Sequence, residues 1–174
     1  MLAADAGVPH SWSPDGRVLL YSRPAASTGI DLWALPMTDE RLSIGSGRPV
    51  PAEGRKPFAV VQSAMDQPGG EFSPDGRWLA YESNESGRFE VHAQPCPEAG
   101  GKWQGSSAGG TQPRWRRDGK ELYYVAPDAR LMAVPVTVSP DGKTLNLGVP
   151  VPRFGTRLAS GAGVNAGRPE YAVA

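Results

Sequence analysis

Few side chains in this sequence have the types and spacings that catalysis needs. A GxSxG pattern occurs at Gly105–Gly109 (GSSAG), the pattern that presents a nucleophilic serine in α/β-hydrolases. That role requires an apolar strand before the serine, a helix after it and a histidine later in the chain. Both histidines, His10 and His92, precede Ser107, and a Gly-Gly-Thr stretch follows it. We interpret the pattern as a chance match in a loop and predict no catalytic residues.

Metal and cofactor sites have equally little support in the sequence. His10 and His92 are far apart in the chain, and no His, Cys or carboxylate stands at the usual ligand spacing from either. Cys96 is the single cysteine, so no intrachain disulfide forms and no cysteine-based metal site is available. The Asp-Gly pairs lack the alternating carboxylates of a calcium loop. We therefore predict no metal and no cofactor.

Aromatic and basic residues are the remaining candidates for binding. Trp33 and Trp103 either pack between repeats or form an aromatic platform for a ligand, and the sequence leaves both open. One cluster of basic residues either lines a solvated turn and strand edge or forms an anion site. It comprises Arg114, Arg116, Arg117 and Lys120.

Composition points to an all-β chain. The 174 residues include 22 glycines and 18 prolines, which divide the chain into short elements. Eighteen basic residues balance 18 acidic ones, so we predict no nucleic-acid partner. No stretch approaches the roughly 18–20 apolar residues of a membrane span, so we predict no membrane insertion. Residues Met1–His10 lack the basic and apolar regions of a secretory signal, and the compartment stays undetermined.

A repeated segment organises the chain. SWSPDGRVLLYS at 11–22, EFSPDGRWLAYES at 71–83 and RWRRDGKELYYVA at 114–126 share one order of features. Each has an aromatic residue, a turn ending in Asp-Gly, a basic residue and an alternating apolar run. Such a segment is typical of a β-hairpin with a type I turn and a left-handed glycine.

The turn residues are predicted to have structural roles. Proline presets the backbone at the second turn position, aspartate caps the turn, and glycine adopts the positive φ that returns the chain to a strand. The third copy lacks the Ser-Pro pair, so proline helps this turn without being required. The predicted structural residues are Pro14, Asp15, Gly16, Pro74, Asp75, Gly76, Asp118 and Gly119.

Each hairpin is followed by two further apolar stretches, which makes four antiparallel strands per repeat, as in a propeller blade. The interval from Asp75 to Asp118 matches the roughly 40–45 residues of such a blade. The interval from Asp15 to Asp75 is longer because a polar loop at 38–56 is inserted; this loop either contacts a partner or acts as a spacer. The expected units are blade 1 at 9–63, blade 2 at 70–106, blade 3 at 111–154 and the first strand of a fourth blade at 169–174.

The strands expected after the hairpins have definite bounds. The third strands are expected at 30–36, 89–95 and 131–136, and the fourth strands at 58–61, 102–106 and 145–154. A further SPDG at 139–142 follows too soon after the third repeat's turn to begin a blade. We therefore expect it to form the outer hairpin turn of blade 3.

The run SPDGRWLAY at 73–81 resembles the WD40-like, TolB-type propeller repeat (PD40). More narrowly, the strings at 83–97, 100–104, 109–125 and 131–136 are similar to the propeller regions of bacterial eukaryotic-like serine/threonine kinases and TolB-like proteins. This resemblance implies recognition of a protein or small ligand and a periplasmic or extracellular location. The kinase motifs themselves are absent from the sequence.

We therefore predict a non-catalytic recognition or sensor module, expected to be a fragment of a larger signalling protein. An alternative is the gating propeller of a prolyl-oligopeptidase-type serine peptidase whose catalytic domain is absent, and a third is a truncated product with no independent role. Closed propellers usually have four to eight blades. Three blades leave two open edges, through which copies of the chain could self-assemble.

Overall fold

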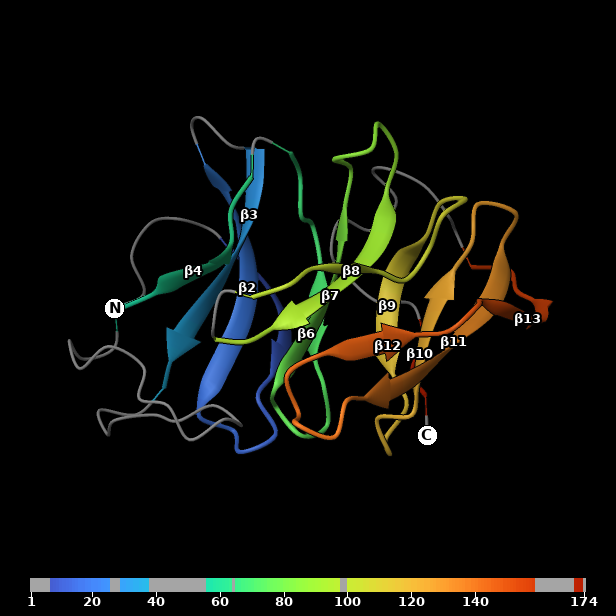
Figure 1. Ribbon diagram of the computed structural model, residues 1–174. Helices are drawn as coiled ribbons and strands as arrows, with labels where there is room; N and C mark the ends of the chain where they lie inside the picture. Colours follow the sequence, from blue (N-terminus) through green and yellow to red (C-terminus); the bar gives the residue numbers. More distant parts are fainter. Residues whose placement is uncertain are drawn as a thin grey trace.

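The computed structural model describes residues 7–25, 29–37, 56–63, 65–97, 100–158 and 171–173. Three antiparallel β-sheets stand side by side in chain order (Figure 1). The predicted all-β class is confirmed. Apart from Lys56, the loop expected at 38–56 lies outside the described residues.

The first sheet has the order β1-β2-β3-β4. Its strands are Val8–Trp12, Val18–Ala25, Gly29–Pro36 and Phe58–Val61. Strands β2 and β3 pair without interruption from Val18–Pro36 to Ala25–Gly29. Their alternation places Leu20, Leu32 and Ala34 on one face, where they are fully buried.

The second sheet has the order β5-β6-β7-β8. Its strands are Gly70–Phe72, Trp78–Ser83, Glu90–Pro95 and Trp103–Gln104. All six residues of β6 are buried because a sheet covers each of its faces. The outer strand β8 is shorter than the stretch expected at 102–106, since the Val91 N–H donates to the Ser106 hydroxyl instead of to the backbone of β8.

The third sheet has the order β9-β10-β11-β12, with β13 also paired to β11. Its strands are Thr111–Trp115, Glu121–Val125, Arg130–Val138, Leu145–Leu147 and Val151–Gly155. The single fourth strand expected at 145–154 is therefore wrong: two short strands occupy that stretch. Gly148, Val149 and Pro150 interrupt it, so β12 pairs with one end of β11 and β13 with the other. The SPDG at 139–142 forms the β11–β12 turn, as predicted.

The two cores lie between neighbouring sheets. Leu20 and Leu32 of the first sheet pack with Leu79 and Tyr81 of the second. Trp78 and Val91 of the second sheet pack in the other core, which also contains residues of the third sheet. Burial of this apolar surface is the main force that holds the sheets together. The inner strands β1, β5 and β9 are neighbours in space.

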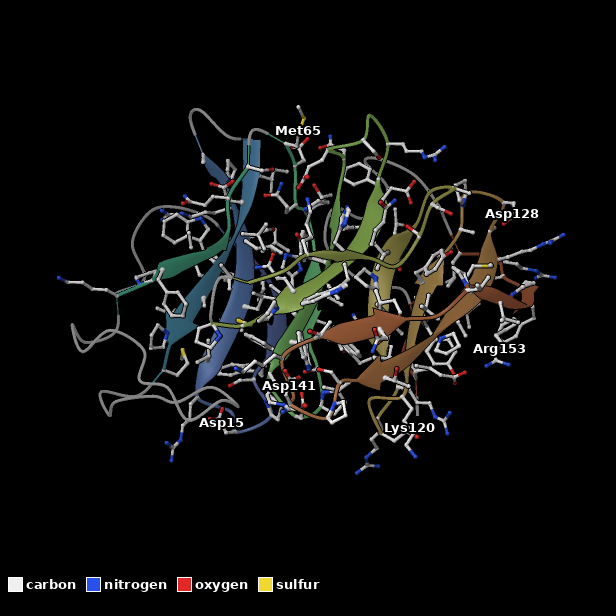
Figure 2. All side chains as sticks on the ribbon, viewed as in Figure 1. Asp15, Met65, Lys120, Asp128, Asp141 and Arg153 are labelled. Atoms are coloured by element: carbon white, nitrogen blue, oxygen red, sulfur yellow. The ribbon has the colours of Figure 1, made fainter. Side chains whose placement is uncertain are left out.

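Connections alternate between two opposite faces of the molecule. One face carries the four Asp-Gly turns at 13–17, 73–77, 116–120 and 139–143, and we call it the turn face. The other carries the loops at 65–69, 84–89, 105–110 and 126–129, and we call it the loop face. Figure 2 places Asp15, Asp141 and Lys120 at the lower edge of the view and Met65 and Asp128 toward the upper edge.

Candidate binding cleft

The Asp-Gly turns of the turn face are closed by their own side chains. In three of them a serine Oγ donates to an aspartate Oδ1 at 2.5 Å. These pairs are Ser13–Asp15, Ser73–Asp75 and Ser139–Asp141. The same hydroxyl accepts a hydrogen bond from the backbone N–H five residues later, at 2.9 Å for Trp78. In the first two turns one serine hydroxyl therefore closes the turn and accepts the N–H of the first residue of the next strand; in the third, Ser139 accepts the N–H of Thr144, directly before β12.

The remaining turn geometry repeats in all four turns. Gly16, Gly76, Gly119 and Gly142 have φ between 70° and 72°, which only glycine adopts without strain. Pro14 and Pro74 are exposed beside them. In the third turn the N–H of Gly119 donates to Arg116 O, and the Asp118 carboxylate caps the N–H of Lys120.

Two of these turns border an open cleft of about 770 Å³ between the second and third sheets. Buried Trp78, Trp115, Val136 and Leu145 form its apolar lining. Its other lining residues come from the turns at 73–75 and 117–120 and from β11. They are Ser73, Pro74, Asp75, Arg117, Asp118, Gly119, Lys120, Pro135, Thr137 and Val138. Residues predicted only to shape turns therefore also line a cleft.

Both aspartates at the cleft are already engaged. Burial alone would raise the pKa of Asp75, but hydrogen bonds from Ser73 and Arg77 outweigh it and hold the pKa below its usual range. Asp118 lies 3.3 Å from the Arg116 guanidinium, which also contacts Glu121 at 3.0 Å. Neither carboxylate pairs with Arg117 or Lys120.

The basic cluster expected in this region is divided by the structure. Arg114 leaves it, because its guanidinium pairs with Glu71 at 3.0 Å in a part-buried contact between inner strands. Arg116 is held by Asp118 and Glu121. Arg117 and Lys120 stay exposed at the cleft.

Glu71 ties the second sheet to the third. Its carboxylate also accepts the Trp115 N–H at 2.7 Å, and its carbonyl accepts the Trp115 indole N–H at 3.2 Å. Burial raises the pKa of Glu71, and the nearby Arg114 charge offsets part of that rise. The same place in the first repeat is Ser11, whose Oγ accepts the Phe72 N–H at 3.4 Å. In each contact, the residue directly before the aromatic residue of one repeat accepts the backbone N–H of the aromatic residue of the next repeat.

Glu82 makes a second contact between these sheets. Its carboxylate accepts the N–H of Gln112 at 3.0 Å, and Gln112 has a φ of 55°. Burial raises the pKa of Glu82 to about 7. The Gln112 carbonyl accepts the Tyr171 hydroxyl at 2.7 Å. Residues Tyr171–Val173, in the segment expected to begin a fourth blade, are irregular and lie against the third sheet.

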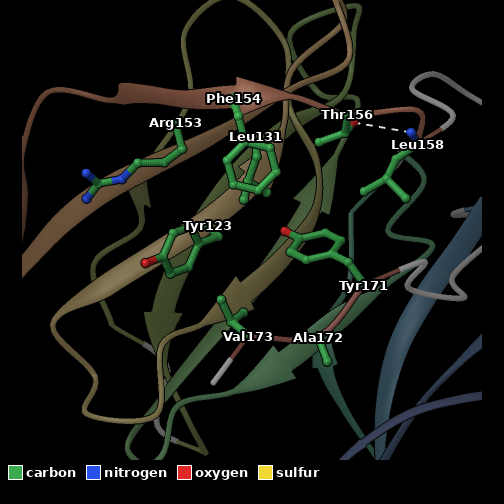
Figure 3. A pocket seen from close by; sticks show the side chains of 9 residues that line it. All are labelled: Tyr123, Leu131, Arg153, Phe154, Thr156, Leu158, Tyr171, Ala172 and Val173. Atoms are coloured by element: carbon green, nitrogen blue, oxygen red, sulfur yellow. Dashed lines mark hydrogen bonds between the residues drawn. The ribbon is translucent and has the colours of Figure 1, made fainter.

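A second, smaller cleft of about 440 Å³ lies beside Tyr171 on the third sheet (Figure 3). Leu131, Phe154 and Leu158 give it an apolar lining. Its two phenol groups are committed elsewhere, since Tyr123 donates to Glu121 and Tyr171 to Gln112. A ligand in this cleft would therefore make mainly apolar contacts, because both tyrosine hydroxyls already have hydrogen-bond partners.

The GSSAG segment has a structural role in the part that is described. The Ser106 hydroxyl donates to the buried Glu90 carboxylate and accepts the Val91 N–H at 2.8 Å. The Gly109 N–H also donates to Glu90, at 3.0 Å. Ser107 is exposed at the loop face. These bonds hold the β8–β9 connection against β7.

The histidines and tryptophans also have local partners. The buried His92 ring lies 5.6 Å from the Tyr81 ring, and burial lowers its pKa. Arg23 stacks over Trp33 at 3.5 Å, and Trp103 meets Trp78 edge to face at 5.6 Å. Over the described ranges, no three His, Cys, Asp or Glu side chains are grouped to hold a metal ion. The described residues also contain no helix that could cross a membrane.

Sequence reasoning missed the inter-sheet roles of Glu71, Glu82 and Arg114. The available signal was position: Ser11, Glu71 and Arg114 each directly precede the aromatic residue of their repeat. The cleft itself has no signal in the sequence, because its lining comes from two repeats.

Comparison with known proteins gives structural similarity alone. No family model matches the sequence, and no curated protein matches it. A protein assigned as TolB from Agrobacterium tumefaciens is similar with a TM-score of 0.57 and 19% identity, over 86% of this chain and 51% of that chain. A protein assigned as a 6-phosphogluconolactonase from Bacteroides uniformis has a TM-score of 0.52 and 18% identity, over 87% and 43%. Puromycin hydrolase has a TM-score of 0.50 and 19% identity, over 83% and 22%.

The chain thus spans about half or less of the length of these structures. They include proteins named as enzymes as well as TolB, so the shared fold does not decide between catalysis and binding. At these identities the similarity concerns the fold. The chain forms three blades of a β-propeller whose fold is similar to that of TolB.

Proposed function

We propose that this chain is a non-catalytic recognition module that binds a segment of another protein in the cleft between blades 2 and 3 on the turn face. The observation that carries the proposal is the cleft itself, with an apolar lining, charged residues at its turns and a volume of about 770 Å³. Binding sites typically combine apolar walls with a few placed polar groups.

The framework around the cleft supports this role. Its sides belong to hairpins whose turns are closed by Ser73–Asp75 and Asp118–Lys120 hydrogen bonds. Glu71 fixes blade 2 to blade 3 beneath them. A site held by rigid elements loses little entropy when a partner binds.

A selection from a random peptide library on phage, with the full chain as target, tests the proposal. Thr137 is exposed in the cleft, so Thr137→Trp fills the opening without changing the buried lining. Ser107→Trp adds the same bulk on the loop face, where the Ser107 side chain is exposed and its hydroxyl bonds to no other described residue. We expect peptides that bind the natural chain and the Ser107 variant but lose at least about tenfold in affinity for the Thr137 variant. Peptides that bind all three proteins equally would place recognition elsewhere.

Self-association through open blade edges is a separate proposal about partners. The last of the described strands, β13, is exposed along its whole length. Val151 and Phe154 are exposed on it by 45% and 63%. An exposed apolar strand is a surface on which another sheet can pack or pair.

A further inference from the structure

We infer that the partner segment is acidic and carries apolar side chains between its carboxylates. This inference rests on the proposed function, because it names the chemistry of the ligand for the same cleft. Two exposed cations, Arg117 and Lys120, lie at this cleft beside its apolar lining.

Arg117 and Lys120 have no ion-pair partner within the described part of the chain. The two carboxylates that line the cleft have partners inside their own turns. Asp75 accepts from Ser73 and from the backbone and side chain of Arg77. Asp118 accepts from the backbone of Lys120 and pairs with Arg116. The cleft therefore presents two uncompensated positive charges.

An incoming carboxylate is the group that these cations fit. The Arg117 guanidinium can hold a carboxylate through two parallel hydrogen bonds, and the Lys120 ammonium adds a compact charge nearby. Lys143, exposed in the adjacent β11–β12 turn, adds a third cation without an ion pair among the described residues.

A ligand that fills this cleft must supply apolar contacts as well as negative charge. Pro135 and Val138 are exposed on β11, and Trp78, Trp115 and Leu145 lie below them. An extended peptide points successive side chains in opposite directions. A segment with alternating acidic and apolar residues would place its carboxylates at Arg117 and Lys120 and its apolar groups against β11.

The same face disfavours a polyanion such as nucleic acid or an anionic lipid surface. Carboxylates and cations alternate around it, since the turns that carry Asp15, Asp75, Asp118 and Asp141 each also carry Arg or Lys. A continuous array of phosphates would meet all four carboxylates, whereas a short segment in the cleft meets only Asp75 and Asp118, which pair with Arg77 and Arg116. The chain also has no net positive charge to attract a polyanion from a distance.

The test uses the full chain and three fluorescein-labelled peptides. The first alternates Glu and Leu, the second replaces every Glu with Gln, and the third replaces every Glu with Lys. The charge-reversal variant is Arg117→Glu with Lys120→Glu. The control, Arg130→Glu with Arg157→Glu, makes the same charge change at two exposed residues that do not line the cleft, of which Arg130 pairs with Asp128 at 3.3 Å. Circular dichroism confirms that each variant is folded.

We expect the Glu-Leu peptide to bind most tightly and its affinity to fall at least about tenfold with the cleft reversal, but not with the control. Binding should also weaken as salt rises. If the Gln or Lys peptide binds as tightly and Thr137→Trp still blocks it, the acidic ligand is wrong and the recognition function stands. If none of the three peptides binds, or Thr137→Trp has no effect on binding, the acidic ligand is overturned. The library selection then decides the recognition function separately. If duplex DNA or phosphatidylglycerol vesicles bind more tightly than the Glu-Leu peptide through Arg117 and Lys120, the proposal of an acidic peptide ligand is also overturned.

Discussion

Ser73 shows how one side chain can define a turn and begin a strand. Its hydroxyl donates to Asp75 and accepts the buried N–H of Trp78. Ser139 makes the same two bonds in an exposed turn, to Asp141 and Thr144. The two turns have nearly identical geometry, with φ of 70° at Gly76 and 72° at Gly142. They differ in burial, and that difference sets what each serine contributes.

We expect Ser73→Ala to lower the free energy of unfolding by about 1–3 kcal/mol, because it leaves the Trp78 N–H buried without a partner. Ser139→Ala should cost less, about 0.5–1 kcal/mol, since water can reach that turn. Urea unfolding followed by tryptophan fluorescence measures both. Equal losses in the two variants would contradict the role assigned to burial.

Glu82 is the residue whose protonation state should affect folding at neutral pH. Its folded pKa of about 7 is above the ordinary value of 4.5, because burial penalises the charged form. The folded protein therefore holds this proton more tightly than the unfolded chain does. Stability from this group is complete below about pH 4.5 and is lost as pH rises through 7.

We expect Glu82→Gln to remove this loss while keeping an oxygen that can accept the Gln112 N–H. The variant should be more stable than the natural chain at pH 8, by up to about 3 kcal/mol, and closer to it at pH 5. Urea unfolding at both pH values makes the comparison. A natural chain that is equally stable at both, with no change in the variant, would refute the assignment.

At the scale of elements, the inner strands are joined by polar side chains as well as by apolar packing. Glu71 of β5 contacts Arg114 and the backbone of Trp115 in β9. Between β1 and β5 the equivalent contact is the longer one from the Phe72 N–H to Ser11. The junction of blades 2 and 3 therefore depends on charge more than the junction of blades 1 and 2.

We expect Glu71→Ala to destabilise the chain by about 2–4 kcal/mol, since it leaves Arg114 part-buried without its carboxylate. Arg114→Met in the same chain should recover part of that loss by removing the unpaired charge. The matched control is Ser11→Ala, for which a loss below about 1 kcal/mol is expected. Thermal unfolding of the natural chain and the three variants decides it: failure of Arg114→Met to recover stability would argue against an ion-pair role.

Strand β11 shows how one element can serve two neighbours. Its nine residues, Arg130–Val138, pair with β10 on one side. On the other side β12 pairs with its second half and β13 with its first half. Gly148, whose N–H donates to Pro135 O, marks the change between them. This arrangement places Pro135, Thr137 and Val138 at the cleft.

At the scale of the whole molecule, the described blades share two cores and leave apolar surface on β13. We propose that copies of the chain associate through it. Phe154→Ser should reduce association, because Phe154 is 63% exposed and its burial on a partner would be lost. Met65→Ser, at a loop-face residue that is 43% exposed, is the control.

Sedimentation velocity over a range of concentrations measures this effect. We expect the average sedimentation coefficient of the natural chain and of the Met65 variant to rise with concentration, and that of the Phe154 variant to rise less. A natural chain that sediments as a monomer throughout would contradict the proposal.

The expected association with kinases rests on sequence resemblance alone.

The sequence by itself determined the hairpins and the turn residues. Ser-Pro-Asp-Gly acts over four residues through fixed φ values and side-chain caps, so it can be interpreted without knowledge of the rest of the chain. The alternating strands followed from the same local logic, which placed Leu20, Leu32 and Ala34 on one buried face.

Only the tertiary structure decided which turn residues meet across blades. Asp75 of blade 2 and Lys120 of blade 3 line the same cleft. The ion pair between Glu71 and Arg114 brings together residues 43 positions apart in the sequence. The tertiary structure also separates the basic residues: Arg117 and Lys120 are exposed, whereas Arg114 forms an ion pair with Glu71. Such contacts depend on how one sheet packs against the next, and residue spacing along a single strand carries no information about that packing.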